Sequence, residues 1–300
     1  IKPQEFVNKA WGSFTAELPK KVALKQPDEF RVGIISDMHD NAFMADLAGK
    51  TLNAFDVDGM IVAGDSTASG LKYEQFITKA IVNNTEGIEF RGDVLGNHDT
   101  EASQQPFRDA DFIDLNDGQV KAFGPLTVMG IQSNQYTALG RDTVELGPKN
   151  DEVAQRVADT ACEQDNPVNM VVGHEPQRGD RVVAQACTEL FVAAHMHDQI
   201  NPTPITGDSG TNVYRMINGT TGGAESAFTY GEPINPADIT FLTYKIGFDG
   251  TATFDGWQHV RYIRSGRAEV SDYTQVAPAI TSQQLSRERA VPIGVKQSLK

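Results

Sequence analysis

The chain has 300 residues, of which 39% are hydrophobic and 22% charged, a composition that is ordinary for a globular protein and excludes collagen-like or disordered chains. Its 26 Lys and Arg against 40 Asp and Glu give a net charge of -14, so binding to long nucleic acids is not expected. Two cysteines exclude a disulfide-dense scaffold, and no apolar run reaches the roughly 18 residues of a membrane span.

The first half of the chain predicts an N-terminal flanking segment followed by a layered α/β domain. Residues 1–30 are mixed and punctuated by prolines, and we expect a strand or a wrapping segment there. From residue 31, β-branched or apolar runs alternate with segments of helical periodicity, which predicts a βαβαβ series. We expect strands at 32–36, 60–63 and 90–95, and helices at 44–55 and 73–82.

The second half continues this alternation and then becomes mainly β. Between residues 111 and 132, Asn116-Asp117-Gly118 and Gly124-Pro125 predict hairpin-like turns between short strands. The remaining expected elements are helices at 151–162 and 180–186 and strands at 168–172, 191–194, 213–217, 239–246, 252–257 and 260–263. We expect one domain over residues 31–270 and a C-terminal tail over 271–300, in place of the two domains that the length suggests.

The two cysteines bear on the compartment. Cys162 and Cys187 each precede an apolar run, and if those runs are neighbouring parallel strands, about 4.8 Å apart, a disulfide is feasible. A disulfide would indicate an oxidising, extracytoplasmic or cell-surface location, whereas two buried free thiols are an equal alternative that would allow a cytoplasmic one. The first residue is Ile1, which suggests a mature or trimmed form whose signal or membrane anchor lies outside the given chain.

Five of the six histidines fall in short polar clusters, each of which follows a predicted strand. The clusters are Asp37-Met38-His39, Gly64-Asp65, Gly96-Asn97-His98-Asp99, Gly173-His174 and His195-Met196-His197. Ligand sites of open α/β sheets lie at the carboxyl ends of the strands, so we expect the five segments to meet in one crevice. One cluster alone would be weak evidence, but five in this order argue against a purely structural origin.

The residue types and spacing indicate metal binding. Asp37 and His39, like His195 and His197, are two residues apart, and in extended backbone such side chains point the same way. Glycines before three of the clusters permit tight turns out of the strands. Carboxylate, imidazole and amide ligands without a thiolate suit Mn, Fe or Zn.

These motifs resemble those of the calcineurin-like metallophosphoesterase superfamily over about residues 31–265. The resemblance implies a four-layer α/β/β/α sandwich with mixed sheets and two divalent metal ions. Carried over by position, it assigns Asp37, His39 and His197 to the first metal, Asp65 to both, and Asn97, His174 and His195 to the second. It makes His98 an unligated histidine near the scissile phosphate, so that His98, Asp65 and Asn97 form the expected catalytic set.

The implied activity is hydrolysis of a phosphodiester in a small phosphate ester or headgroup. Two cations would clamp the phosphate and generate a hydroxide that attacks phosphorus, and His98 would stabilise the developing charge or protonate the leaving group. A phosphomonoesterase or nucleotidase, a nuclease and a catalytically weak metal-binding scaffold are alternatives. The sequence lacks the Gly-x-Ser-x-Gly elbow of serine hydrolases and the phosphate loop of P-loop ATPases.

The sequence departs from the family pattern at two positions. Ala68 stands where relatives often carry an Asp that orients the catalytic histidine, so Asp99 or another group is expected to substitute. Ala194 replaces a glycine, and Met196 is expected near the rim of the site. Weaker candidates for substrate contacts are Asp40, Asn41, the loop 220–223, Arg141, Arg178 and Arg181, while His259 is expected to be structural.

Overall fold

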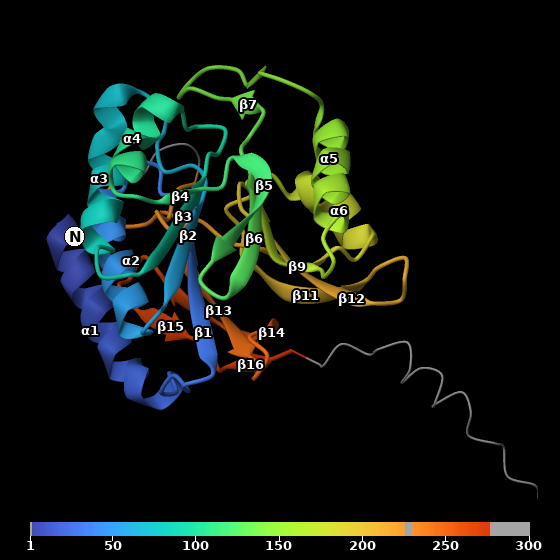
Figure 1. Ribbon diagram of the computed structural model, residues 1–300. Coiled ribbons are helices and arrows are strands. Elements are labelled where there is room, and N and C mark those ends of the chain that lie inside the picture. Colours follow the sequence, from blue (N-terminus) through green and yellow to red (C-terminus); the bar gives the residue numbers. More distant parts are fainter. Residues whose placement is uncertain (1, 226–229, 277–300) are drawn as a thin grey trace, which may run out of the picture.

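Figure 1 shows a computed structural model of the protein, which describes residues 2–225 and 230–276. Two β-sheets pack face to face in the centre of the molecule. The helices between residues 3 and 109 cover the outer face of one sheet, and those between residues 150 and 184 cover the other (Figure 1). Three separate apolar cores fill the spaces between these layers, which confirms the predicted α/β/β/α sandwich.

The first sheet has a parallel centre and antiparallel flanks. Strand β1 pairs in parallel with β2, and β2 with β3, whereas β13 is antiparallel to β1. The order is β15-β14-β13-β1-β2-β3-β4, with β16 also paired to β14. The bounds are β1 Glu29–Ile35, β2 Gly59–Ala63, β3 Phe90–Val94, β4 Ile113–Asp114, β13 Ala237–Ile246, β14 Ala252–Tyr262, β15 Ala268–Val270 and β16 Thr274–Gln275.

The second sheet has the order β11-β12-β10-β9-β6-β5, and a separate two-stranded ribbon joins β7 to β8. The strands are β5 Asp117–Phe123, β6 Leu126–Ile131, β7 Gln135–Tyr136, β8 Val144–Glu145, β9 Val168–Gly173, β10 Thr188–Ala193, β11 Ile200–Thr206 and β12 Asn212–Ile217. The helices are α1 Pro3–Lys21, α2 Ala42–Ala54, α3 Gln75–Asn84, α4 Glu101–Asp109, α5 Asn150–Cys162 and α6 Asp180–Ala184, with short 3₁₀ turns at Lys72–Glu74 and Pro176–Gly179.

Strand β1 illustrates how the residue pattern sets the layers. Successive side chains of a strand point to opposite faces, and Val32 and Ile34 enter the core between the sheets while Ile35 enters the core beneath the helices. Gly33 also faces the helices, where an added Cβ would lie 2.1 Å from the side chain of Leu52 in α2. The glycine therefore lets α2 approach the sheet closely.

The N-terminal segment is a helix, so the expectation of a strand or wrapping segment is wrong. Phe6, Ala10 and Phe14 recur every four residues and are fully buried, which is the spacing of one helix face. Helix α1 packs this face against α2 and β15, and Pro3 occupies its first position, where a missing N–H is tolerated.

The segment between residues 111 and 132 follows the prediction only in part. Gly124-Pro125 joins β5 to β6 as an antiparallel hairpin, as expected. Asn116-Asp117-Gly118, however, is not a hairpin, because β4 pairs with β3 in the first sheet and β5 with β6 in the second. The chain crosses between the sheets there. The two strands expected at 252–257 and 260–263 form the single strand β14.

The described part of the C-terminal tail contains β16, which pairs with β14. The rest of the predicted tail, residues 277–300, lies outside the described residues. Among the helices described, none has both the length and the apolar character that crossing a membrane requires.

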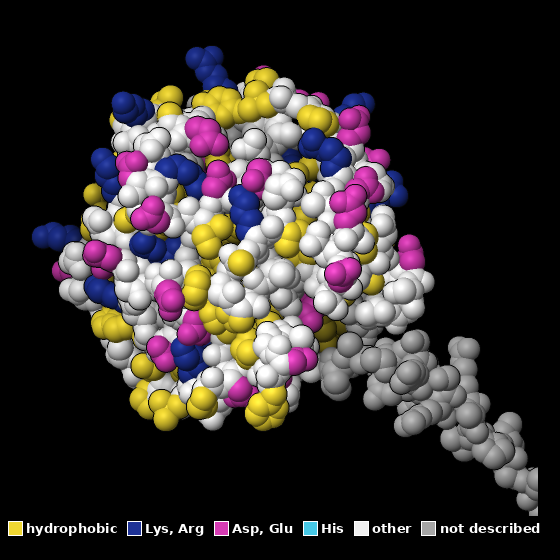
Figure 2. Space-filling model, viewed as in Figure 1, with side chains coloured by type: hydrophobic (Ala, Val, Ile, Leu, Met, Phe, Trp, Pro, Cys, Tyr) yellow, Lys and Arg dark blue, Asp and Glu magenta, His cyan; other side chains and the backbone are white. Residues whose placement is uncertain are grey.

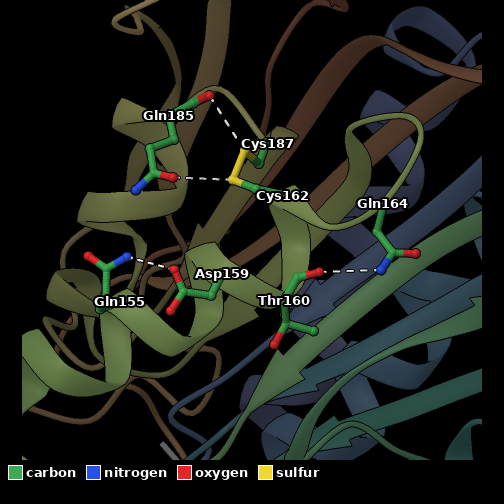
Figure 3. The surroundings of a disulfide bond; sticks show 7 residues. All are labelled: Gln155, Asp159, Thr160, Cys162, Gln164, Gln185 and Cys187. Atoms are coloured by element: carbon green, nitrogen blue, oxygen red, sulfur yellow. Dashed lines mark hydrogen bonds between the residues drawn. A yellow bond between two sulfur atoms is a disulfide. The ribbon is translucent and has the colours of Figure 1, made fainter.

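Cys162 and Cys187 form a disulfide, with their Cα atoms 5.0 Å apart. Strands β9 and β10 are parallel neighbours, as the disulfide hypothesis required. Figure 3 shows the bond joining the end of α5 to the segment before β10, with oxygen atoms of Gln185 3.4 and 3.5 Å from the two sulfurs. The bond therefore ties a helix of the outer layer to the sheet it covers.

Replacing both cysteines by Ser is expected to lower the free energy of unfolding by about 3 kcal/mol, because the bond closes a loop of 25 residues in the unfolded chain. Denaturant titration of the double variant would measure this. The turnover number at 25 °C should not change, because the disulfide lies next to the start of β10. The predicted site residues follow the end of β10. A variant as stable as the wild type would contradict the prediction.

Candidate metal centre

The structure places all five predicted clusters at the carboxyl ends of parallel strands. In the first sheet, Asp37 and His39 follow β1, Asp65 follows β2, and Asn97 follows β3. In the second sheet, His174 follows β9. His195 and His197 follow β10, the neighbour of β9. The site therefore draws on both sheets of the sandwich.

The side chains form two groups that could each hold a cation. Asp37, His39 and His197 make the first group, and Asp65, His174 and His195 the second, with the ligand atoms of each group within 4.8 Å of one another. Asp65 Oδ2 lies 3.0 Å from His174 Nε2 and 3.8 Å from His39 Nε2. It thus faces both groups, as a bridging ligand would.

Backbone carbonyls fix the orientation of two of these histidines. Nδ1 of His174 donates to the Ala63 carbonyl at 2.8 Å, and Nδ1 of His197 donates to the Ala224 carbonyl at 3.1 Å. Because a carbonyl only accepts, these nitrogens carry protons, and Nε2 of each ring faces the centre. A partner of this kind is typical of histidines that bind metals.

Two buried acceptor oxygens at the centre lack a hydrogen-bond partner. They are Asp37 Oδ1 and Asn97 Oδ1, and leaving such atoms unsatisfied is costly. Asn97 is oriented by its Nδ2, which donates to Thr137 Oγ1 at 3.0 Å, so its oxygen is the free end of the amide. Oxygen acceptors that await a positive charge fit divalent cations such as Mn, Fe or Zn.

The pKa shifts of the residues at the centre also indicate a site for cations. Burial alone would raise the pKa of the Asp65 carboxyl, but the adjacent His174 outweighs it and holds this pKa far below its usual range. Burial would likewise lower the pKa of His174, yet the Asp65 carboxylate beside it raises that pKa to about 10. Without metal, the centre therefore retains a proton on His174.

Metal binding should consequently release that proton. Since the His174 pKa is raised to about 10, the proton is held below that pH, and metal affinity should rise about tenfold per pH unit between about pH 7 and 8. Calorimetric titration of the metal-free protein with Mn²⁺, in buffers of different ionisation enthalpy, would count the protons released. Heats that do not depend on the buffer would contradict the assignment.

Five of the ligand residues have a left-handed backbone. The φ angles are 48° at Asp37, 44° at His39, 53° at Asp65, 70° at His195 and 56° at His197, a region that non-glycine residues enter rarely. The expectation that each i, i+2 pair converges through extended backbone is therefore wrong. The pairs converge because the chain turns sharply after each strand, and such strain is typical of functional sites.

His98 is held by the backbone of residue 68. Its Nδ1 donates to the Ala68 carbonyl at 2.9 Å, so Nε2 is left for other contacts. The missing Asp at position 68 is therefore replaced by the carbonyl of the same residue, and not by Asp99. The backbone N–H of His98 also donates to Asp65 Oδ1 at 2.8 Å, which links the loop after β3 to that after β2.

Asp99 has a different role, since it joins two ligand loops. Its carboxylate accepts from the backbone N–H of Gly96 at 3.1 Å, of Thr67 at 3.0 Å and of Ser66 at 3.3 Å. Burial raises the pKa of Asp99 to about 6. This residue positions the loops that carry Asp65 and Asn97.

The structure places most of the weaker candidates in structural roles. Arg178 is buried, donates to the Glu175 carboxylate at 2.5 Å and to the Gln132 carbonyl at 2.8 Å, and does not face the centre as a phosphate ligand would. Arg181 pairs with Asp151 at the surface, and Arg141 is exposed on the segment between β7 and β8. His259 pairs with Asp238 at 2.7 Å, consistent with its structural interpretation.

The remaining candidates lie in or beside the loop after β1, which carries Asp37 and His39. Asn41 caps α2 and donates to the carbonyls of Gly222 and Gly231. The hydroxyl of Thr220 donates to the Asp37 carbonyl at 2.7 Å, so the loop 220–223 braces the loop after β1. Burial and the Glu74 carboxyl raise the pKa of Asp40 to about 8.

Thr137 was not predicted from the sequence. It binds Asn97 twice, because its backbone N–H also donates to the Asn97 carbonyl at 2.7 Å. It lies 40 residues away in a segment without a motif, so no local signal marks it.

The centre opens onto a cavity of about 460 Å³. Its lining combines site residues with a rim of mixed character: Asp65, His98, Thr137, His195, Met196, His197, Asp198, Glu225 and Asn235. Within the described residues, no Lys or Arg lines it, so positive charge for a phosphate would come from bound metals. Met196 lies at the rim, as expected, and its side chain is exposed.

Solved structures share this fold at low sequence identity. Haemophilus influenzae NAD nucleotidase superposes with a TM-score of 0.52 and 14% identity, over 88% of this chain and 55% of its own. A Thermus thermophilus protein gives 0.51 and 7%, over 81% and 98%. Purple acid phosphatase from yellow lupin gives 0.50 and 13%, over 84% and 54%.

The chain thus spans little more than half the length of the nucleotidase and of the plant phosphatase. No curated protein matches the sequence. A family model does match, over residues 30–199, and its description is calcineurin-like phosphoesterase. The matched region holds every ligand described above and covers more than half of the sequence, so the chain belongs to the calcineurin-like phosphoesterase family.

Proposed function

We propose that the protein hydrolyses a phosphodiester in a small molecule or headgroup with the help of two divalent metal ions. The observation that carries this proposal is the pair of buried, unpartnered oxygens on Asp37 and Asn97. These residues follow β1 and β3, and Asp65 follows β2, the strand that lies between them. Buried acceptors of this kind are rare unless a cation satisfies them.

The protein's own residues would have two roles, which are to hold the metal ions and to protonate the leaving oxygen. Bound cations would supply positive charge for the phosphate and a water of lowered pKa. Asp65 and the two ligand groups would hold these cations, and Asn97 would add an amide oxygen. His98 is fixed through Nδ1 by the Ala68 carbonyl and lines the cavity, and in its doubly protonated form it would donate the Nε2 proton to the leaving oxygen and become a neutral ring.

The charge around the cavity supports a diester over a monoester. A phosphomonoester carries about one more negative charge than a diester at neutral pH, and the rim carries the carboxylates of Asp198 and Glu225. Among the described lining residues there is no Lys or Arg to balance that extra charge. The same rim disfavours long nucleic acids.

Assays with bis-p-nitrophenyl phosphate and mono-p-nitrophenyl phosphate in the presence of Mn²⁺ test the proposal. We expect faster hydrolysis of the diester, and near-complete loss of it in Asn97→Ala. Asn84→Ala, at the end of α3 and outside the site, is the matched control and should retain activity. Faster hydrolysis of the monoester would favour a phosphomonoesterase or nucleotidase, and inactivity on both would refute the proposal.

We also propose that the protein works in an oxidising compartment outside the cytoplasm. The Cys162–Cys187 disulfide supports this location, because such bonds are rare in reducing cytosol. Intact-mass measurement of protein purified from its native source with thiols blocked at lysis would test it. Two alkylated cysteines would contradict the proposal.

A further inference from the structure

Exposed apolar side chains occur on the segments that flank the metal centre. We define the apolar rim as six of them, each 45–72% exposed: Leu71, Tyr73, Leu139, Met196, Tyr230 and Ile234. Large apolar side chains exposed singly are normal, but a group of them around a site marks an interaction surface. Figure 2 shows yellow side chains gathered at the top of the molecule, over the segment that contains β7 and β8.

One rim residue lines the cavity, and two others are close in sequence to residues that line it. Met196 lines it. Ile234 precedes Asn235, which also lines it. Leu139 lies two residues after Thr137, and its backbone N–H donates to Ser69 Oγ at 3.0 Å, one residue beyond the Ala68 carbonyl that holds His98.

The other three complete the rim on both sides. Leu71 and Tyr73 continue the same loop beyond Ser69, toward α3. Tyr230 makes an edge-on contact with Phe43 at the start of α2, with 5.3 Å between ring centroids. Its neighbour Gly231 binds Asn41, in the loop that follows His39. The apolar rim is therefore contributed by the segments after β2, β7 and β10 and by the segment before β13.

We infer that the apolar rim rests on a lipid layer and that the phosphodiester hydrolysed is that of a lipid headgroup. The inference rests on the proposed function and specifies its substrate class. A protein partner or a second copy of this chain seated on the rim would cover the metal centre. A lipid layer instead offers apolar contact to the rim and presents a phosphodiester to the cavity that Met196 lines.

The charges indicate which lipids fit. A protein with a net charge of -14 is repelled by anionic membranes. Asp198 and Glu225 lie on the cavity and form no hydrogen bond or ion pair within the described residues, although Arg261 acts on Asp198 electrostatically. Free carboxylates beside a phosphate site suit a headgroup with an ammonium group, so we commit to zwitterionic lipids.

The reaction balances without an oxidant or a further co-reactant. Water supplies the oxygen that forms the new bond to phosphorus, and the bond from phosphorus to the leaving alcohol oxygen breaks. The leaving oxygen takes up a proton and becomes an alcohol. The phosphate monoester product keeps the other ester oxygen and its substituent.

The test compares two variants of the Mn²⁺-loaded protein on phosphatidylcholine vesicles and on soluble bis-p-nitrophenyl phosphate. Tyr73→Ser with Leu139→Ser removes two rim side chains. Phe248→Ser is the matched control, because Phe248 is fully exposed but follows β13. The end of β13 pairs with the start of β1, whereas the metal centre lies beyond the end of β1. We measure co-sedimentation with vesicles, release of headgroup and soluble turnover.

We expect the wild type and Phe248→Ser to bind vesicles, and the double variant to bind about tenfold or more weakly with unchanged soluble turnover. Stronger binding to vesicles of anionic phosphatidylglycerol than to phosphatidylcholine would overturn the choice of lipid. Soluble turnover without vesicle binding, or a dimer that the double variant dissociates, would overturn the inference. Absence of soluble turnover in the wild type would instead refute the proposed function.

Discussion

His98→Gln is expected to lower kcat by about 10²–10⁴-fold while two metal ions remain bound per chain. The reason is the geometry of the ring, whose Nδ1 is used by the Ala68 carbonyl and whose Nε2 faces the cavity. His98 belongs to neither group of candidate ligands. Removing it should therefore remove a proton donor and leave the metal content unchanged.

Comparing two leaving groups tests specifically whether His98 donates a proton. p-Nitrophenolate is a stable anion that needs little protonation, whereas an alkyl alkoxide needs a proton as it leaves. The loss in His98→Gln should therefore be larger for a diester with an alkyl leaving group. His259→Gln is the matched control, because His259 pairs with Asp238 and does not line the cavity. Equal losses on both substrates would contradict a proton-donating role.

Asp65→Asn is expected to weaken binding of both metal ions and to abolish turnover. Asp65 faces both ligand groups, and even partners that only orient ligands change metal affinity by about 10–100-fold. A bridging carboxylate should exceed that range. In the wild type, a 100-fold excess of Mn²⁺ over its Kd should add about 2.7 kcal/mol to the free energy of unfolding, and the variant should lose this gain.

Elemental analysis and thermal unfolding with and without Mn²⁺ would measure both effects. Asp198→Asn is the control, because Asp198 lines the same cavity but belongs to neither ligand group. Two tightly bound ions in Asp65→Asn would show that this residue does not bridge. Fewer than one tight ion in the wild type would favour the metal-binding scaffold over the enzyme.

The identities of the site residues could be predicted because each stands in a short motif at the end of a strand. Five strand ends that meet at one edge leave few alternatives for where His174 and Asp65 can lie. The groups that orient these side chains could not be predicted, because many of them are backbone carbonyls. The carbonyls of Ala63, Ala68 and Ala224 orient three histidines, and any residue type could supply them.

The elements that escaped prediction lack strong apolar periodicity or carry unfavourable residues. Helix α4 is short, contains Pro106 and buries only Phe107 among its large apolar side chains. Strand β11 contains Pro202 and Pro204, which are tolerated because it is an edge strand. Helix α1 could have been found, since Phe6, Ala10 and Phe14 lie on one helical face.

The left-handed backbone of the ligand loops has an evolutionary consequence. A non-glycine residue in this conformation costs about 1–2 kcal/mol, and five ligand residues adopt it. Glycine would relieve this strain at each position but would remove a metal ligand. A lineage released from selection on this site would therefore gain folding stability by drifting to glycine after β1, β2 and β10. The histidines and aspartates at these turns persist only as long as selection on the site opposes that drift.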